Sequence, residues 1–236
     1  MSSIKHSLSI ALLMFNEEEN IATVLDETLA FCRGALDDWE IVVVDDGSTD
    51  GSVSIVQQYI ESEARVRLVR HETNQGMGAG IRTGIENATK EYFIFNASDG
   101  QIAAAEIGVL LPLLERADIA LSTYANRRET LARELTSRSF RFYLQVVAGI
   151  RFELQGLYLY PTKSAKELAP LIEADTFFFS FELIQRGVER GLTIANTWMT
   201  CRPREAGSSK VFNPSRIIRV GKEALGYGIR KRLGSR

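Results

Sequence analysis

The stretch "WEIVVVDDGSTDGS", Trp39–Ser52, decides the fold class. Its first half is a continuous β-branched run, and its second half is rich in the Asp, Gly, Ser and Thr residues that form turns. A short, uniformly apolar run bounded by turn residues is typical of a strand inside a parallel sheet. The stretch therefore predicts a buried strand that carries Asp45 and Asp46 to a loop at its end.

The segments around this stretch alternate between strand and helix patterns, with short connections. Strand patterns occur at 7–15, 66–73, 91–97 and 118–125, and helical spacing of apolar residues occurs at 16–36, 53–64, 74–89 and 104–117. Asn16 is placed to cap the first of these helices. The alternation predicts an α/β fold with a Rossmann-like, mostly parallel central sheet and helices on both faces.

The second half is less regular. It predicts a long helix at 128–148, a strand at 154–161, a helix that ends at Gly191, an edge strand at 193–205 and a final helix at 214–233. We therefore divide the chain into a main domain, 1–213, and a basic amphipathic C-terminal helix or tail, 214–236.

Composition is that of an ordinary globular protein, with 236 residues of which 45% are hydrophobic and 25% charged. The sequence has no run of 18 apolar residues, so we expect no transmembrane helix. The first apolar run passes directly into "NEEEN", which favours a strand over a signal peptide. Cys32 and Cys201 make no metal-ligand spacing and are expected to be reduced. These features favour a cytoplasmic protein.

Charge is distributed unevenly. Residues 202–236 hold ten Lys and Arg and two Glu, a net charge of +8, so the remaining chain carries −10 of the total of −2. Such asymmetry indicates an anionic partner, and we expect peripheral binding to the cytoplasmic face of a membrane. Nucleic acid is not expected, because the tail has no interleaved aromatic residues and matches no recognised module.

Polar residues follow each of the first four predicted strands. Asn16 and Glu17 follow the first, Asp45 and Asp46 the second, the turn 74–80 the third, and Asp99 with Gln101 the fourth. Each loop alone is better explained by turn formation or helix capping. Ligands of open parallel sheets lie outside the carboxyl ends of the strands, so four such loops on one edge favour a binding site.

The third loop, "NQGMGAGIRTG", is rich in glycine but does not match two common motifs. Ile81 stands where the last glycine of a dinucleotide fingerprint belongs, and no Gly-Lys-Ser/Thr follows for a P-loop. Small residues still allow a backbone to approach a ligand, and a helix N-terminus favours anions.

Four ordered segments resemble a known family. "SIALLMFNEEENI", "EIVVVDDGSTDGS", "NQGMGAGIRTGIENATKEYFIFNASDGQ" and "RPREAGSSK" are similar to the motifs of the family 2 inverting glycosyltransferases of the GT-A fold. The dolichyl- or polyprenyl-phosphate sugar transferase branch is the most similar, over most of residues 7–215. The resemblance implies that 1–213 is a catalytic domain with a nucleotide-sugar donor.

The resemblance places the donor contacts at the strand ends. The implied donor-binding residues are Asn16, Glu17, Asp45, Asp46, Gly76, Gly78, Arg82, Ser98 and Asp99. The family's third loop usually reads Asn-x-Gly-Lys-Gly, but Met77 stands at the lysine, and Arg82 would partly replace its charge.

The fourth motif departs from the family in a metal ligand. The usual Asp-Ala-Asp-Gly-Gln is here Ala97-Ser98-Asp99-Gly100-Gln101, so the first carboxylate is missing. The implied ligands of Mg²⁺ or Mn²⁺ are Asp99 and Gln101, which need substrate oxygens to complete a weak site. Alternatively the cation is dispensable, and cationic side chains stabilise the departing diphosphate.

The remaining implied site residues are mainly basic. By resemblance, the acceptor-phosphate contacts are Arg127, Arg133, Arg202, Arg204, Ser209 and Lys210, and the catalytic residues are Asp99, Arg204, Lys210 and Glu182. Arg133 is equally well explained as the solvated face of a helix, and Glu182 as a helix-start residue.

A phosphate acceptor is already ionised and needs no general base, whereas a hydroxyl acceptor does. We therefore favour inverting transfer of a sugar from a UDP- or GDP-sugar to a polyprenyl phosphate. One alternative is a soluble or glycan acceptor with Glu182 or Asp175 as the base. Another is a degenerate nucleotide-sugar-binding protein without turnover, which Met77, Ala97 and Phe152 support.

Overall fold

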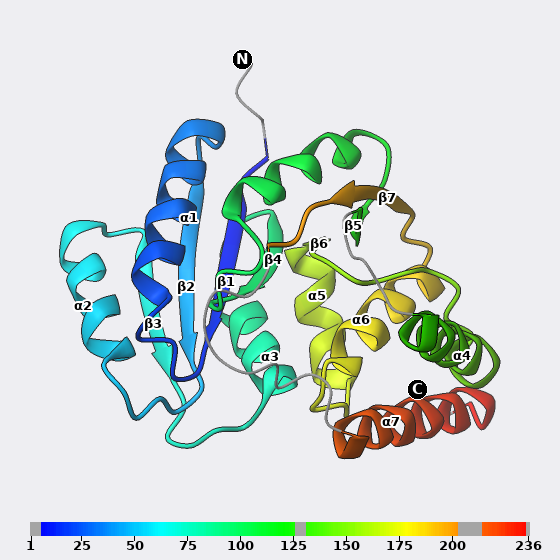
Figure 1. The fold of residues 1–236 in the computed structure, drawn as a ribbon. Helices are drawn as coiled ribbons and strands as arrows, with labels where there is room; N and C mark the ends of the chain where they lie inside the picture. Colours follow the sequence, from blue (N-terminus) through cyan, green and yellow to red (C-terminus); the bar gives the residue numbers. More distant parts are fainter. Residues whose placement is uncertain (1–5, 126–130, 203–213, 235–236) are drawn as a thin grey trace.

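The structure is a computed structural model that describes residues 6–125, 131–202 and 214–234, with the backbone alone described for 131–135 and 214–216. Its described strands form one seven-stranded sheet in the order β3-β2-β1-β4-β6-β5-β7 (Figure 1). The strands are β1 Leu8–Met14, β2 Trp39–Asp45, β3 Val66–Arg70, β4 Tyr92–Ala97, β5 Ile119–Tyr124, β6 Tyr158–Pro161 and β7 Ile194–Met199.

The sheet is mostly parallel, as the alternation of patterns predicts. Strands β1 to β4 run parallel to one another, β6 is antiparallel to both β4 and β5, and β7 runs parallel to β5. Strand β7 ends the sheet, so the predicted edge strand is confirmed. The carboxyl ends of β1, β2 and β4 therefore meet at one edge.

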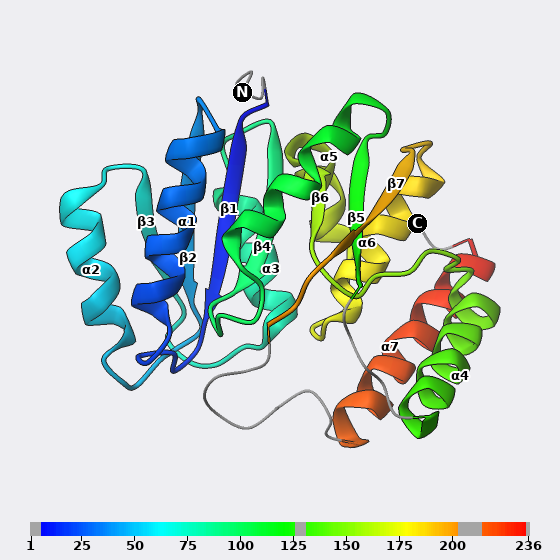
Figure 2. The same ribbon diagram turned by 45° about the horizontal axis from the view of Figure 1, so that its top comes forward.

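Helical segments cover both faces of the sheet, which confirms the predicted α/β architecture (Figure 2). One face carries α1 Ile21–Ala35, α2 Ser52–Ser62 and the 3₁₀ helices η1 Ala104–Val109 and η2 Leu111–Glu115. The other carries α3 Met77–Asn87, α5 Thr162–Leu168, the 3₁₀ helix η3 Ala169–Leu171 and α6 Phe178–Glu189. Helices α4 Leu131–Ala148 and α7 Pro214–Arg232 pack together beside α6.

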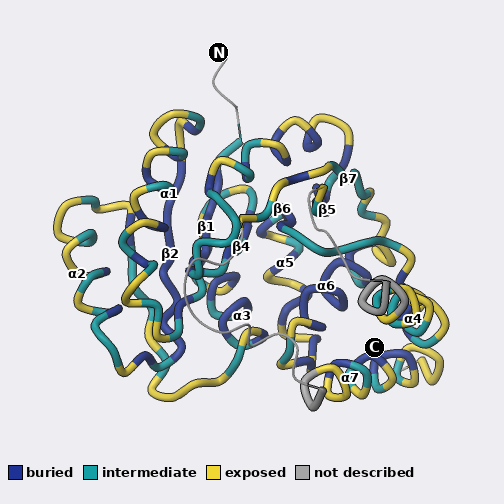
Figure 3. The backbone as a smooth tube through the Cα atoms, in the orientation of Figure 1, coloured by how far each residue is buried: buried dark blue, intermediate teal, exposed yellow. Residues whose placement is uncertain are grey.

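Alternation along β1 divides the core into two layers. Ile10 and Leu12 pack on the α1 side, whereas Ala11 packs on the α3 side. A Cβ added at Gly84 of α3 would lie 2.8 Å from the Ala11 Cβ, so these small residues bring the helix close to the strand. The central strands are consequently buried along almost their whole length (Figure 3).

Two local predictions are wrong. Helix α1 begins at Ile21, and Asn16 does not cap it but lies in a turn with a φ of 53°. The segment predicted as one helix at 104–117 forms η1 and η2 instead. Pro112 lies in the first turn of η2 and lacks the N–H that a continuous α-helix would need there.

Helix α7 packs against the rest of the fold. Val220, Ala224 and Tyr227 are buried, and the Tyr143 hydroxyl of α4 donates to the Gly221 carbonyl at 2.8 Å. A Cβ added at Gly228 would lie 2.0 Å from the Val147 oxygen, so glycine permits this close contact. None of the helices in the described ranges is long and apolar enough to cross a membrane.

Candidate functional site

The loops after β2 and β4 are both anchored to the end of β1. The Asp46 N–H donates to the Met14 carbonyl at 2.8 Å, and the Ser98 N–H donates to the Leu13 carbonyl at 3.0 Å. Parallel pairing places Asp45 opposite Met14 and Ala97 opposite Leu13. The edge thus brings the loops that carry Asn16, Asp46 and Asp99 next to one another.

The Asn16 and Glu17 loop is bonded to the loop after β2. The Asn16 N–H donates to the Ser48 Oγ, and the Asn16 Oδ1 accepts from the Thr49 N–H, both at 2.9 Å. The Glu17 N–H donates to the Ser52 Oγ at 2.9 Å. These bonds fix both loops before any ligand binds, and Asn16 remains exposed.

Asp45 and Asp46 occupy different environments. Asp45 is fully buried, accepts from the Arg70 Nε at 2.8 Å and accepts from the Ser48 N–H at 3.0 Å. The Asp46 carboxylate accepts from the N–H groups of Gln75 and Gly76 at 2.8 and 2.9 Å. The Asp46 side chain retains 13% exposure and the Asp45 side chain none, so Asp46 is the better placed of the pair to contact a nucleoside.

The glycine-rich turn makes its close approach to another part of the protein. The Gly78 N–H donates to the Asp175 carbonyl at 2.9 Å, and a Cβ at Gly78 would lie 2.6 Å from the Asp175 backbone. Gly76, with a φ of 91°, turns the chain into α3. The helix N-terminus is therefore already held by Asp46 on one side and Asp175 on the other.

The Asp175 segment is in turn held by α7. The Glu223 carboxylate accepts from the Thr176 Oγ1 at 2.5 Å and from the Asp175 N–H at 3.4 Å. Arg219, one turn earlier on α7, lies 3.5 Å from the Asp175 carboxylate and 3.6 Å from that of Glu223. A chain of contacts thus runs from α7 to the glycine-rich turn.

Arg82 lies on α3, but its guanidinium is bonded within the protein. The Nη2 donates to the Ile172 carbonyl at 2.8 Å, and the guanidinium carbon lies 5.3 Å from the centre of the Phe179 ring. The buried Nε has no hydrogen-bond partner among the described residues. In this arrangement Arg82 supports the Ile172 loop, and a diphosphate contact would need its side chain to move.

The Asp99 loop carries a partly exposed carboxylate and lies next to two buried oxygen atoms. The Asp99 Oδ1 accepts from the Gln101 N–H at 3.1 Å, and the carboxylate is partly exposed. The Asn96 Oδ1 and Ser98 Oγ are buried and lack hydrogen-bond partners within the described part of the chain. Oxygen atoms in such a loop suit a hard divalent cation.

Arg202 is connected to the Asp99 loop through its backbone. Its N–H donates to the Gln101 carbonyl at 2.8 Å, whereas its Nη1 lies 2.7 Å from the Glu27 carboxylate on α1. The other predicted acceptor residues Arg127, Arg204, Ser209 and Lys210 lie outside the described residues, and for Arg133 only the backbone on α4 is described.

Glu182 is fully buried on α6. Its Oε1 lies 2.8 Å from the Arg186 Nη2, and its Oε2 lies 3.9 Å from the Arg230 Nη2 of α7 without a hydrogen bond. Burial raises the pKa of this carboxyl, and Arg186 opposes that rise only in part. This environment favours a structural role over contact with a sugar.

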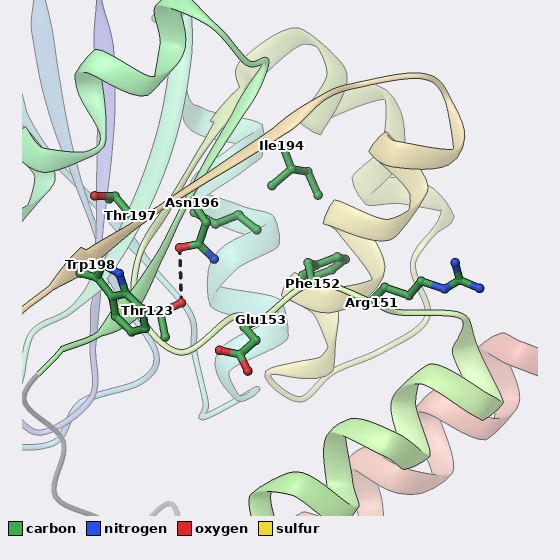
Figure 4. A pocket seen from close by; sticks show the side chains of 9 residues that line it. Thr123, Arg151, Phe152, Glu153, Ile194, Asn196, Thr197 and Trp198 are labelled. Carbon is green, nitrogen blue, oxygen red and sulfur yellow. Dashed lines mark hydrogen bonds between the residues drawn. The ribbon is translucent and has the colours of Figure 1, made fainter.

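A cavity of ≈ 440 Å³ opens beside β5 and β7 (Figure 4). Its polar and aromatic lining includes Thr123, Arg151, Glu153, Asn196 and Trp198. Trp198 is 66% exposed. The Thr123 Oγ1 lies 3.3 Å from the Asn196 Oδ1. Thr123 and Trp198 line the cavity one residue before the ends of β5 and β7. In the sheet, these two strands are separated by β6 from β4, the strand that leads to the Asp99 loop.

The loop-rich carboxyl edge of a mostly parallel sheet is where open α/β proteins bind their ligands. The profile of Glycosyl transferase family 2 matches residues 9–187. The chain therefore belongs to that family, as its motifs indicate.

Curated relatives share the family at low identity. An undecaprenyl-phosphate 4-deoxy-4-formamido-L-arabinose transferase of Pectobacterium carotovorum is 29% identical over 61% of this chain and 44% of its own length. A dolichyl-phosphate beta-glucosyltransferase of Dictyostelium discoideum is 22% identical over 96% and 75%. A dodecaprenyl-phosphate galacturonate synthase of Rhizobium johnstonii is 26% identical over 90% and 64%. The chain thus spans less than half the length of the first relative.

Solved structures support the fold. Glucosyl-3-phosphoglycerate synthase from Mycobacterium tuberculosis, in complex with UDP, has a TM-score of 0.64 at 20% identity, over 95% of this chain and 80% of that one. A structure of S. aureus TarS 1-349 with UDP-GlcNAc has a TM-score of 0.59 at 19% identity, over 97% and 73%. Another structure of the mycobacterial synthase contains Mn²⁺, UDP and phosphoglyceric acid.

Three residues around the site were not singled out from the sequence. His71 lies between Asp46 and Thr83, with its ring nitrogens 2.8 and 2.9 Å from their oxygens. It directly follows β3, so the strand-end rule that selected Asp46 could also have found it. Arg70 and Glu223 act through contacts distant in sequence, for which the motifs carry no signal.

Proposed function

We propose that this protein transfers a sugar from a UDP- or GDP-sugar to a polyprenyl phosphate, with inversion at the anomeric carbon. The observation that carries the proposal is the joined carboxyl edge of β1, β2 and β4 in a chain of this family. Relatives named for undecaprenyl, dodecaprenyl and dolichyl phosphate favour the acceptor class.

The proposed reaction is an in-line displacement. An acceptor phosphate oxygen attacks the anomeric carbon, and the bond from that carbon to the donor diphosphate breaks with its electron pair on the leaving nucleoside diphosphate. The acceptor oxygen is already ionised, so no side chain has to remove its proton. This agrees with the burial of Glu182, the carboxyl predicted to act in catalysis.

The donor would lie along the carboxyl edge. Asn16 and Asp46 are the proposed contacts to the nucleoside, and the Asp99 loop would face the diphosphate. Asp99 is the proposed catalytic residue among these donor contacts. The proposed basic contacts Arg204 and Lys210 would act from the segment after Arg202, whose backbone is bonded to Gln101.

The oxygen-rich Asp99 loop fits a divalent cation held with few protein ligands. No group of three or more His, Cys, Asp or Glu suited to a metal occurs among the described residues. Asp99 and Gln101, with donor diphosphate oxygens, would hold Mg²⁺ or Mn²⁺, which neutralises charge on the leaving group when bound. The buried Asn96 Oδ1 has no hydrogen-bond partner in the described part of the chain, which supports a cation that binds oxygen atoms at this loop.

A thermal-shift screen tests the donor half of the proposal. UDP-, GDP- and other nucleotide sugars would be added with and without Mn²⁺, and a bound donor raises the melting temperature by mass action. Ala97→Asp restores the family's first carboxylate and should tighten Mn²⁺ binding by about tenfold. Donors that fail to stabilise the protein in either condition contradict the proposal.

Radiolabelled transfer assays test the acceptor half. Polyprenyl phosphate and free glycans would compete under identical donor conditions. The cavity beside β7 favours one alternative, because an exposed indole with amide, hydroxyl and carboxylate groups suits a sugar ring. Transfer to glycans alone would select that alternative, and donor binding without transfer to either acceptor would select a binding protein without turnover.

A further inference from the structure

Helices α4 and α7 form a parallel pair at one side of the molecule (Figure 2). Tyr143 bonds to Gly221, whereas the Arg232 Nη2 donates to the Val146 carbonyl at 3.0 Å, so contacts advance along both helices in the same direction. The inward sides are packed, with Leu144 on α4 and Ala224 on α7 buried.

The outward sides of both helices are also apolar. We define the outer surface as five exposed residues, Phe142 at 68%, Val146 at 54%, Ile218 at 59%, Leu225 at 46% and Ile229 at 47%. Their spacings of four on α4, and of seven and four on α7, place them in one stripe on each helix. On each helix, the stripe lies about a quarter turn around the helix axis from the residues that contact the other helix. The two quarter turns run in opposite directions on the two parallel helices, so both stripes face the same side of the pair.

This outer surface is unusual for a helix pair in water. A surface helix normally has one apolar face and one polar face, and a helix that is apolar on two sides is normally covered. Exposed apolar residues outside α4 and α7, such as Val109 and Leu171, lie on several different elements, whereas Ile217 and Leu233 add to those of the α7 segment. Adjacent exposed side chains on two packed helices therefore indicate a binding surface.

Charge identifies the partner. Lys222 lies within the α7 stripe, three residues before Leu225, and is exposed, and Arg232 follows at the end of the helix. The segment 202–236 carries a formal +8 while the remainder carries −10. On α7, Arg219, Arg230 and Lys231 are paired with acidic residues, whereas Lys222 and Arg232 have no acidic partner among the described residues. Two copies docked through this surface would bring two basic segments together, whereas an anionic surface would attract them.

We propose that the α4–α7 outer surface binds an anionic lipid bilayer, with both helices lying in the plane of the interface. The apolar stripes would enter the boundary between headgroups and acyl chains, and Lys222 and Arg232 would remain among the anionic headgroups. The inference deepens the proposed function by placing the enzyme where a polyprenyl phosphate would be, but lipid binding needs neither donor nor acceptor.

Co-sedimentation of the full chain with vesicles tests this inference. Wild-type protein should bind phosphatidylglycerol-containing vesicles at low salt, and should bind pure phosphatidylcholine vesicles much less. Phe142→Glu on α4 and Leu225→Glu/Ile229→Glu on α7 should each weaken binding by about tenfold or more. Lys222→Ala should weaken it by about fivefold, with a loss of salt dependence.

The matched control is Val109→Glu, which makes the same kind of change on η1, against the opposite face of the sheet. It should bind vesicles as wild type does, and circular dichroism should show all variants folded. A nucleotide-binding assay on the same samples separates failure of lipid binding from failure of the proposed function.

Three outcomes would overturn the inference. The first is a wild-type protein that ignores anionic vesicles at low salt. The second is normal vesicle binding by Phe142→Glu, because the surface would then involve α7 alone. The third is a wild-type dimer, measured by light scattering, that Phe142→Glu converts to a monomer without any change in vesicle binding.

Discussion

Two buried glutamates show how the halves of this molecule differ. Glu40 on β2 accepts hydrogen bonds from Ser9, Arg67 and Thr89, at distances from 2.5 to 3.0 Å. Glu182 on α6 bonds to Arg186, but its Oε2 has no hydrogen-bond partner within the described residues. Both residues are in the core, yet only the first has its charge fully compensated.

The pKa values of these glutamates move in opposite directions. Burial alone would raise the pKa of Glu40, but its hydrogen bonds outweigh burial and hold the pKa below the ordinary 4.5. At Glu182 burial prevails and raises the pKa above 4.5. The surroundings of Glu40 on β2 are thus preorganised by side-chain contacts, whereas the α6–α7 region retains a carboxyl whose burial is only partly compensated and an exposed apolar surface.

The largest expected effect tests whether the Asp99 loop, in the first half of the chain, takes part in sugar transfer. Asp99→Ala should reduce sugar transfer by at least about 100-fold, because it removes the partly exposed carboxylate proposed to act at the diphosphate. Initial rates under saturating donor measure this. Asp118→Ala, which alters a carboxylate just before β5 at the opposite edge, is the control. Full activity of Asp99→Ala would remove the catalytic assignment.

The next effect concerns the stability of the preorganised half. Glu40→Gln should lower the free energy of unfolding at pH 7 by about 2 kcal/mol, because the bond from Arg67 loses its charge. Since the folded pKa is lowered, this stabilisation is present above pH 4.5 and is lost as pH falls below it. Urea unfolding at pH 7 and pH 3.5 measures both parts. A loss that persists undiminished at pH 3.5 would contradict the charge-based explanation.

A smaller effect tests the connection between the halves. Glu223→Ala should weaken donor-nucleotide binding by about fivefold, roughly 1 kcal/mol, because Thr176 and Asp175 would no longer be held against the glycine-rich turn. Calorimetry in the absence of lipid measures the affinity. Lys222→Ala changes the neighbouring residue on the outward side and should leave that affinity unchanged. A purely structural role would lower the melting temperature of Glu223→Ala and leave donor affinity intact.

The smallest effect should come from Glu182→Gln. A raised folded pKa means that the wild-type carboxyl stabilises the fold most at low pH and loses this contribution as pH rises from 4.5 through the folded value. The variant should therefore gain stability relative to wild type as pH rises, with transfer almost unchanged. Unfolding curves from pH 4.5 to pH 8 check the trend. A severe loss of transfer with normal donor binding would restore Glu182 as a catalytic candidate.

Local patterns predicted the elements well where burial and periodicity agree. Strand β2, edge strand β7 and helix α7 all lie within their predicted ranges. The Asn16 cap and the continuous helix at 104–117 are wrong, because a turn to Ser48 and Thr49 and the proline in η2 prevail locally. The sequence patterns therefore predicted the helices and strands better than they predicted the hydrogen bonds at the ends of those elements.

The sequence predicts which residues lie at the candidate site, but not which groups of the protein they bond to. The strand-end rule selects Asp45, Asp46 and Asp99, but it does not show that Asp46 holds the turn at Gly76. The contact between Gly78 and Asp175 joins residues 97 positions apart, a pairing that only the folded chain creates. The sequence accordingly located the edge but not which of its acids remain available to a ligand.

Helix α7 has one further consequence through its two sides. On its inner side, Glu223 holds the Asp175 segment against the glycine-rich turn. On its outer side, α7 carries Ile218, Leu225 and Ile229. Thermodynamic linkage makes any coupling between these sides reciprocal. If lipid contact tightens nucleotide binding by some factor, bound nucleotide must tighten lipid contact by the same factor, and a spent enzyme would leave the bilayer more readily than a loaded one.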